Sequence, residues 1–199
     1  PDPVGFEPIM HKYRLAMPSQ KKKPANIFVC SKADLFGAWV PDRWIEEVFK
    51  ACDAAPWHNY IFMTRYPRRY ELMSSMLQLP CSGSFWYGTT ITRSSDLDQI
   101  VFLPRTQHNQ FISIEPLLEE IDISDIDFMD WIIIGAETSN RRGKVKPKRE
   151  WIEAILQVAR ASEIPIFMNY SKELEEIWGK ALIQEFPVGL TRPEDKPIP

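Results

Sequence analysis

Two glutamates stand directly behind apolar segments of the sequence. Glu115 follows the run FISI, and Glu137 follows the run IIIGA. A carboxylate at the end of a buried strand must be paired or must lie in a solvated cavity. Two of them on neighbouring strands can share a proton, bind an ammonium group or act as general acid and general base. The competing interpretation is a structural ion pair with Arg65 or Arg141.

Other polar side chains follow apolar runs in the same way. They are Ser31, Asp34, Thr64, Arg65, Thr90 and Asn169. In a parallel barrel the carboxyl ends of the strands converge on one rim, where the active site is built. Hydroxyls, carboxylates, a guanidinium and an amide around one pocket suit a polar or zwitterionic ligand. The alternative is that such residues only meet water or cap helices, since Ser, Thr and Asp favour those positions.

The elements that would position these residues are short apolar runs. They span residues 27–30, 60–63, 85–91, 110–114, 131–134 and 165–168. Nearly continuous apolar runs are typical of strands that are covered on both faces, as in parallel sheets. Residues 6–11 form a weaker candidate for a seventh strand, because Pro8 interrupts it.

Helical patterns separate these runs. Three begin at Pro41, Pro67 and Pro147, a fourth covers 172–180, and a weaker one covers 94–103. This alternation predicts an α/β fold made of βα units. We expect a TIM-type (β/α) barrel that is incomplete, with six to seven strands and the first βα unit missing upstream of Pro1. A doubly wound sheet is less favoured, since no Gly-rich phosphate turn follows any run. Residues 1–186 would form the barrel domain, and 187–199 a Pro-rich tail.

Composition narrows the function classes. The 199 residues include 24 Lys and Arg against 27 Asp and Glu, a net charge of −3, which disfavours a general nucleic-acid binder. No apolar stretch approaches the roughly 20 residues of a membrane helix, so no membrane partner is expected. The three cysteines are far apart in the sequence and suggest neither disulfides nor a metal site. A reducing, cytoplasmic location is therefore the expectation.

One segment departs from the acidic average. Residues 141–149 hold six basic side chains in nine. They could contact a nucleic-acid backbone. A solvated loop is the alternative interpretation.

The strand-end motifs also match a known family in combination. The matching segments are FEPIMHKYRL, IFVCSKADLFGAWVP, YIFMTRYPRRY, FWYGTTI, FISIEPLLEEI, DWIIIGAETSNRRGKVKP and PIFMNY, and they cover residues 6–170 in order. With them the chain resembles the phage gene product 37 / gene product 68 family, an uncharacterised group similar to radical-SAM barrels. The resemblance implies a rim that binds S-adenosylmethionine and a 4Fe–4S cluster held by an upstream three-cysteine segment, which this sequence does not contain.

Three hypotheses follow. The first is a radical-SAM-like barrel protein of phage or prophage type, in which Glu115 and Glu137 contact S-adenosylmethionine and Ser31, Asp34, Thr64, Arg65, Thr90 and Asn169 complete the pocket. The second is a metal-free barrel hydrolase that uses the two glutamates. The third is a non-catalytic phage module that binds nucleic acid or a protein through 141–149. Open barrel edges would also invite a protein partner or self-association.

Overall fold

One parallel sheet organises the chain. The computed structural model describes residues 8–76, 79–104 and 108–190. Within them a six-stranded sheet has the strands in sequence order, and every neighbouring pair is parallel. The strands are β1 (Asn26–Phe28), β2 (Asn59–Thr64), β3 (Phe85–Thr90), β4 (Asn109–Ile114), β5 (Trp131–Ile134) and β6 (Ile166–Met168). Each overlaps one of the apolar runs, so the six predicted strands are confirmed, although β1 ends at Phe28, two residues before the end of its predicted run.

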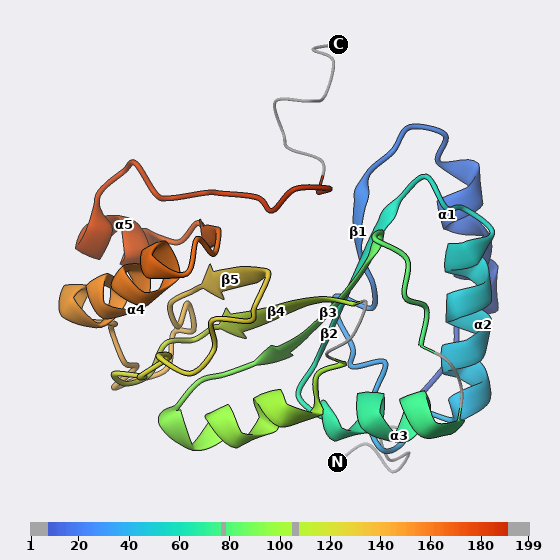
Figure 1. The fold of residues 1–199 in the computed structure, drawn as a ribbon, viewed down its shortest axis with the longest axis horizontal. Coiled ribbons are helices and arrows are strands. Elements are labelled where there is room, and N and C mark those ends of the chain that lie inside the picture. Colours follow the sequence, from blue (N-terminus) through green and yellow to red (C-terminus); the bar gives the residue numbers. More distant parts are fainter. Residues whose placement is uncertain (1–7, 77–78, 105–107, 191–199) are drawn as a thin grey trace.

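The strand order separates the two fold classes that the sequence left open. A doubly wound sheet reverses its strand order at a switch point. Here the order runs from β1 to β6 without reversal, and the sheet curls like half of a barrel (Figure 1). The predicted incomplete barrel agrees with this shape. Of the weak seventh strand, residues 6 and 7 lie outside the described residues, and residues 8–11 form no strand, because Pro8 has no N–H for a ladder.

Among the described residues, two short helices precede the first strand, and the other helices follow strands on the outer face of the sheet. They are η1 (Lys12–Ala16), α1 (Met17–Gln20), α2 (Asp42–Asp53), α3 (Arg68–Met76), η2 (Ser94–Phe102), α4 (Arg149–Ala161) and α5 (Lys172–Trp178). The predicted helix starts at the three prolines are confirmed to within two residues. The weak 94–103 pattern forms a 3₁₀ helix.

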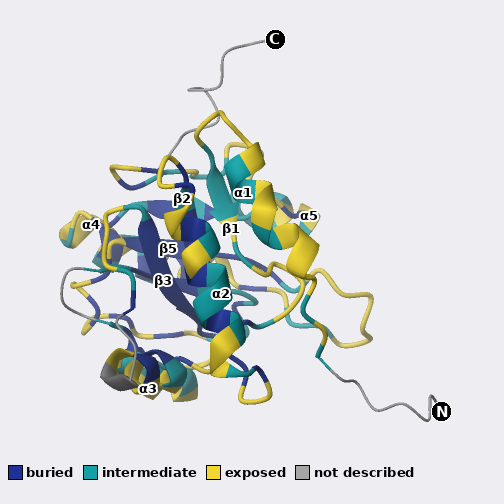
Figure 2. Ribbon diagram, turned by 90° about the vertical axis from the view of Figure 1, so that its right-hand side faces the viewer, coloured by how far each residue is buried: buried dark blue, intermediate teal, exposed yellow. Residues whose placement is uncertain are grey.

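Amphipathic spacing explains how the longer helices pack. In α2, Ile45, Phe49 and Cys52 recur at three- and four-residue spacing and are buried against the sheet. In α4, Ile155 and Ala159 do the same. Figure 2 shows the result: β2, β3 and β5 are largely dark blue, β1 at the edge is teal, and the helices carry exposed yellow residues on their outer sides. The main core therefore lies between the sheet and its helices.

A second, smaller core covers part of the inner face of the sheet. Its buried members are Ile61, Trp86, Phe111, Trp131, Ile133 and Leu190. Residues 183–185 run antiparallel beside β6: Met168 N–H donates to the Ile183 carbonyl at 2.7 Å, and Glu185 N–H donates to the Ile166 carbonyl at 2.8 Å. We call residues 183–190 the strap (Figure 1).

The strap continues from β6 across to the other side of the sheet. Phe186 packs on Trp131, with ring centroids 5.8 Å apart, and Leu190 is buried in the inner core. The Gly189 carbonyl accepts a hydrogen bond from Asn59 Nδ2 at 2.9 Å, at the start of β2. The tail predicted from residue 187 is thus packed through residue 190, and residues 191–199 lie outside the described residues.

Candidate functional site

The register of the strands brings three of the predicted site residues to one end of the inner face. Side chains alternate along a strand, so residues two apart share a face. Glu115 lies four residues after Phe111 and Asn169 lies two residues after Phe167, so both share the inner face with those rings. Thr90 pairs with Ser113, which lies two residues after Phe111 and therefore also faces inward. These positions are at the carboxyl ends of the strands, beyond the part of the inner face that the strap covers.

Glu115 is the centre of this group. Its Oε2 accepts a hydrogen bond from Asn169 Nδ2 at 2.6 Å, across the width of β5. Burial raises the pKa of Glu115 above its ordinary value, although the Asn169 hydrogen bond acts in the opposite direction. Within the described part of the chain, no Lys, Arg or His forms an ion pair with it. A desolvated carboxylate without a cation is a good acceptor for a ligand's ammonium group.

Gly135 makes room for this carboxylate. A Cβ built on Gly135 would lie 2.3 Å from Cδ of Glu115, closer than two such atoms can approach. Its backbone is fixed at the same time, since its N–H donates to Ile114 O at 3.0 Å and its carbonyl accepts from Leu117 N–H at 2.9 Å. The side chain of Glu115 therefore lies over the bare backbone of Gly135, the residue directly after β5, on its way to Asn169. We call Glu115, Gly135 and Asn169 the rim cluster.

Glu137 has a different environment. Its Oε1 accepts from Arg141 Nε at 2.9 Å and from Ser139 Oγ at 2.8 Å. Its Oε2 accepts from Arg141 Nη2 at 3.0 Å and from Val145 N–H at 3.2 Å. These hydrogen bonds, led by the one from Arg141, lower the pKa of Glu137 to about 2. The ion pair with Arg141 is one of the two that the sequence analysis named as alternatives to a catalytic role.

Asp34 and Thr64 form a hydrogen bond with each other and lie outside the rim cluster. Asp34 Oδ1 accepts from Thr64 Oγ1 at 2.7 Å and from Phe36 N–H at 3.0 Å, and its Oδ2 accepts from Arg65 N–H at 2.9 Å. Thr64 also has the strand parity of Phe62, which packs in the outer core. The pair therefore joins two loops, and this role could have been suspected from Asp in a short loop.

The remaining predicted site residues differ in exposure. Ser31 is exposed in the turn after β1, and Thr90 is buried at the end of β3. Arg65 is exposed and lines a cavity at the start of α3. Sequence reasoning missed this cavity, because three segments that are far apart in the chain form it.

The basic run is largely neutralised. Four of its six cations have acidic partners: Arg141 with Glu137, Lys144 with Glu173 at 2.6 Å, Lys146 with Glu176 at 3.1 Å and Arg149 with Glu153 at 2.8 Å. Lys148 lies over the Trp151 ring at 5.3 Å. Most of the positive charge of this run is thus neutralised by carboxylates of α4, of α5 and of the loop itself.

The cysteines do not assemble into a metal site. Cys30 and Cys81 are exposed, whereas Cys52 is buried in α2. Across residues 8–76, 79–104 and 108–190, no three His, Cys, Asp or Glu side chains are grouped so that they could hold a metal ion. None of the helices described there is long and apolar enough to cross a membrane.

A family model matches most of the chain. The family model described as "Protein of unknown function (DUF5131)" covers residues 5–180. The chain belongs to the DUF5131 family. No curated protein and no solved structure matches it. The DUF5131 match spans all six strands and the whole rim cluster, so the half-barrel and its polar end belong to the part that defines the family.

Proposed function

We propose that this DUF5131 protein is a radical-SAM-like, TIM-type barrel protein of phage type that binds S-adenosylmethionine at the rim cluster. The observation that carries the proposal is the Glu115 carboxylate, which is partly desolvated, lacks a cation among the described residues and is held by Asn169 Nδ2 at 2.6 Å. The α-ammonium group of S-adenosylmethionine is a suitable partner for such a carboxylate. The motif resemblance selects this ligand among other ammonium compounds.

Each residue of the rim cluster would have its own role in binding. Glu115 would accept hydrogen bonds from the ammonium group, and Asn169 would hold the carboxylate in place and keep its amide oxygen available to the ligand. Gly135 lets the carboxylate lie against β5. Bound S-adenosylmethionine would supply the chemistry of a group or radical donor.

The iron–sulfur cluster fits the described residues poorly. Cluster irons are held by Cys thiolates, and the three cysteines stand on separate elements with one of them buried. A cluster would therefore need thiolates from outside the described residues. The proposal for the rim cluster concerns S-adenosylmethionine binding alone.

Calorimetric titration of the purified protein with S-adenosylmethionine tests the proposal. We expect saturable binding that strengthens as the pH rises through the raised pKa of Glu115, because the ligand's cation needs the ionised carboxylate. Glu115→Gln should weaken binding at least tenfold. Glu71→Gln removes an exposed carboxylate of α3 and should bind as the wild type does. Equal affinity of the Glu115→Gln variant and the wild type would overturn the assignment.

A second candidate function is supported by the contrast between the two glutamates. The pKa of Glu115 is raised and that of Glu137 is lowered to about 2. Carboxylates whose pKa values are pushed apart are typical of hydrolases that need one acid and one ionised group. Turnover of aryl glycosides or phosphoesters in the absence of a cluster, abolished by Glu115→Gln, would favour this function. A panel of such substrates without turnover would reject it.

A further inference from the structure

A cavity of about 350 Å³ opens at the start of α3, apart from the rim cluster. Its lining comes from the loop before α2, from residues 65–69 and Leu72, and from Gln99 and Phe102 of η2. Neither Glu115 nor Asn169 contributes to it. Its volume is within the range of pockets that hold small organic ligands, roughly 300–1,000 Å³. We call it the α3 pocket.

Hydrogen bonds fix the two loops that form its walls. Asp34 joins the loop before α2 to the end of β2 through Thr64 Oγ1 and the Arg65 N–H. Arg69 then joins α3 to the same loop, since its Nη2 donates to the Val40 carbonyl at 2.9 Å and forms an ion pair with Asp42. The pocket is therefore held in shape without a ligand.

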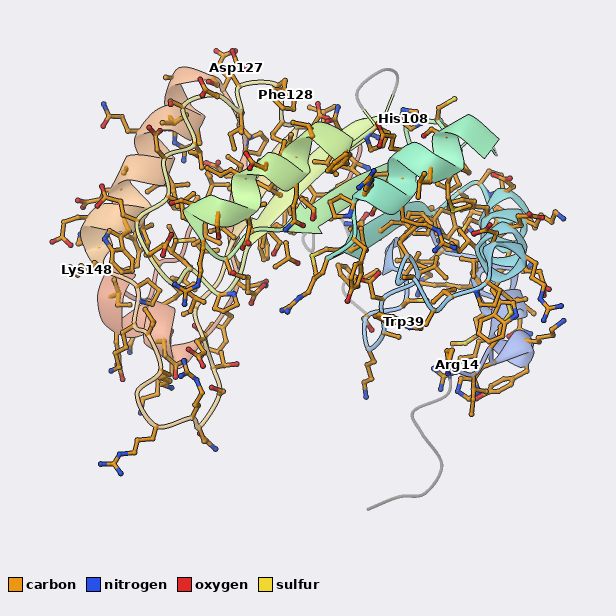
Figure 3. The ribbon with its side chains drawn as sticks, turned by 90° about the horizontal axis from the view of Figure 1, so that it is seen from below. Arg14, Trp39, His108, Asp127, Phe128 and Lys148 are labelled. Carbon is orange, nitrogen blue, oxygen red and sulfur yellow. The ribbon has the colours of Figure 1, made fainter. Side chains whose placement is uncertain are left out.

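Aromatic side chains form an exposed edge beside the pocket. Trp39 and Tyr66 meet edge to face with ring centroids 5.4 Å apart, and they are 49% and 44% exposed. Trp39 folds back over Gly37, where a Cβ would lie 2.5 Å from the indole ring. Figure 3 shows the molecule from the side of α3 and η2 and labels Trp39. Exposed flat rings of this kind are surfaces on which a nucleobase can stack.

The charge of the α3 pocket is positive and largely uncompensated. Arg65, Arg68 and Arg69 line it, and no carboxylate of the described residues does. Of these three arginines, only Arg69 forms an ion pair with a described residue, while Arg68 lies over the Phe102 ring at 5.8 Å. This differs from the basic run, whose Lys148 lies well apart from Trp39 in Figure 3 and whose cations are mostly paired.

We propose that the α3 pocket binds a nucleotide unit, with its phosphate on Arg65 and Arg68 and its base against Tyr66. Guanidinium groups recognise phosphate oxygens through paired hydrogen bonds, and an aromatic ring beside them supplies the stacking surface for a base. The net charge of −3 disfavours a long polyanion. The unit is thus a free nucleoside monophosphate or part of a short single strand.

Calorimetric titration with AMP, inorganic phosphate and a single-stranded DNA hexamer tests this assignment. AMP should bind, and the double variant Arg65→Gln/Arg68→Gln should weaken it at least tenfold. Tyr66→Ala should weaken AMP by about tenfold through lost stacking and leave inorganic phosphate binding unchanged. Arg142→Gln, in the basic run, is the matched control and should bind AMP as the wild type does.

Comparing the hexamer with AMP shows which form of nucleotide the α3 pocket binds. A hexamer that binds no better than AMP assigns the pocket to a free nucleotide, and a hexamer that binds more tightly assigns it to single-stranded nucleic acid. Inorganic phosphate binding as tightly as AMP, or equal AMP binding by the double variant and the wild type, would overturn the proposal. Glu115→Gln should leave AMP binding intact, so failure at the rim cluster and failure here are distinguishable.

Discussion

Glu115 and Glu137 follow similar apolar runs on neighbouring strands, yet the structure gives them opposite environments. Glu115 is partly buried, has one amide partner and has a raised pKa. Glu137 accepts four hydrogen bonds, two of them from Arg141, and has a pKa of about 2. A carboxylate that the protein has already satisfied contributes to the fold, whereas one left desolvated is available to a ligand. The comparison therefore favours Glu115, rather than Glu137, for the ligand-binding role that we propose.

The largest expected effect comes from filling the space beside Glu115. Gly135→Ala would place a methyl group 2.3 Å from Glu115 Cδ, so the side chain or β5 must shift. We expect a loss of about 1–3 kcal/mol in the free energy of unfolding, typical of overpacking, and loss of S-adenosylmethionine binding. Urea denaturation measures the first and calorimetry the second. Gly83→Ala is the control, because a Cβ there meets nothing within 4 Å; equal stability of the two variants would contradict the close approach.

The second effect concerns Glu137 and depends on pH. Its folded-state pKa of about 2 lies below its ordinary value of 4.5, so its ionised form stabilises the fold above pH 4.5. Glu137→Gln should lower the urea midpoint at pH 7. The gap to the wild type should close as the pH falls from 4.5 to 2, because the wild type loses the same interaction there. A gap that persists at pH 2 would show that the Arg141 ion pair is not its source.

Glu115→Gln should act in the opposite direction and more weakly. A carboxyl group whose folded-state pKa is raised costs stability when it is ionised, so the cost is absent below pH 4.5 and grows above it. The amide should therefore raise the urea midpoint slightly at pH 7 and leave it unchanged at pH 4. The amide oxygen of the substituted side chain can still accept the Asn169 hydrogen bond. A lower midpoint at pH 7 would place Glu115 with Glu137 among the structural carboxylates.

The smallest effect is expected at an exposed ion pair of the basic run. Lys146 and Glu176 have side chains that are 60% and 47% exposed, so water screens their attraction. Lys146→Ala should change the free energy of unfolding by less than about 0.5 kcal/mol. Thermal denaturation at low and high salt measures it. A larger, salt-dependent loss would mean that the run is held to α5 more firmly than its exposure implies.

The sheet could be predicted because its signal is local. Each strand is a short apolar run, and each long helix shows its own three- and four-residue spacing, as in Ile45, Phe49 and Cys52. The rim cluster was partly predictable for the same reason: Glu115 and Asn169 stand directly behind strands. The role of Gly135 was not, since it depends on the register between β4 and β5.

Three other features depend on contacts between distant segments. Asp34 follows β1 and Thr64 ends β2, so the sequence placed both at the rim. In the structure they hydrogen-bond to each other and are not part of the rim cluster. The α3 pocket needs η2 as well as both loops. The strap combines Phe186 and Leu190 with neighbouring Pro and Gly residues, so its composition resembles a tail although it covers an apolar face.

The position of the strap in the sequence has a consequence for biosynthesis. The ribosome makes residues 183–190 after all six strands, so the aromatic inner face around Trp86 and Trp131 emerges before its cover. Exposed apolar surface on a nascent chain attracts chaperones and other nascent chains. A chain that ended between β6 and Leu190 would leave this surface bare, so we expect the strap to complete the fold last.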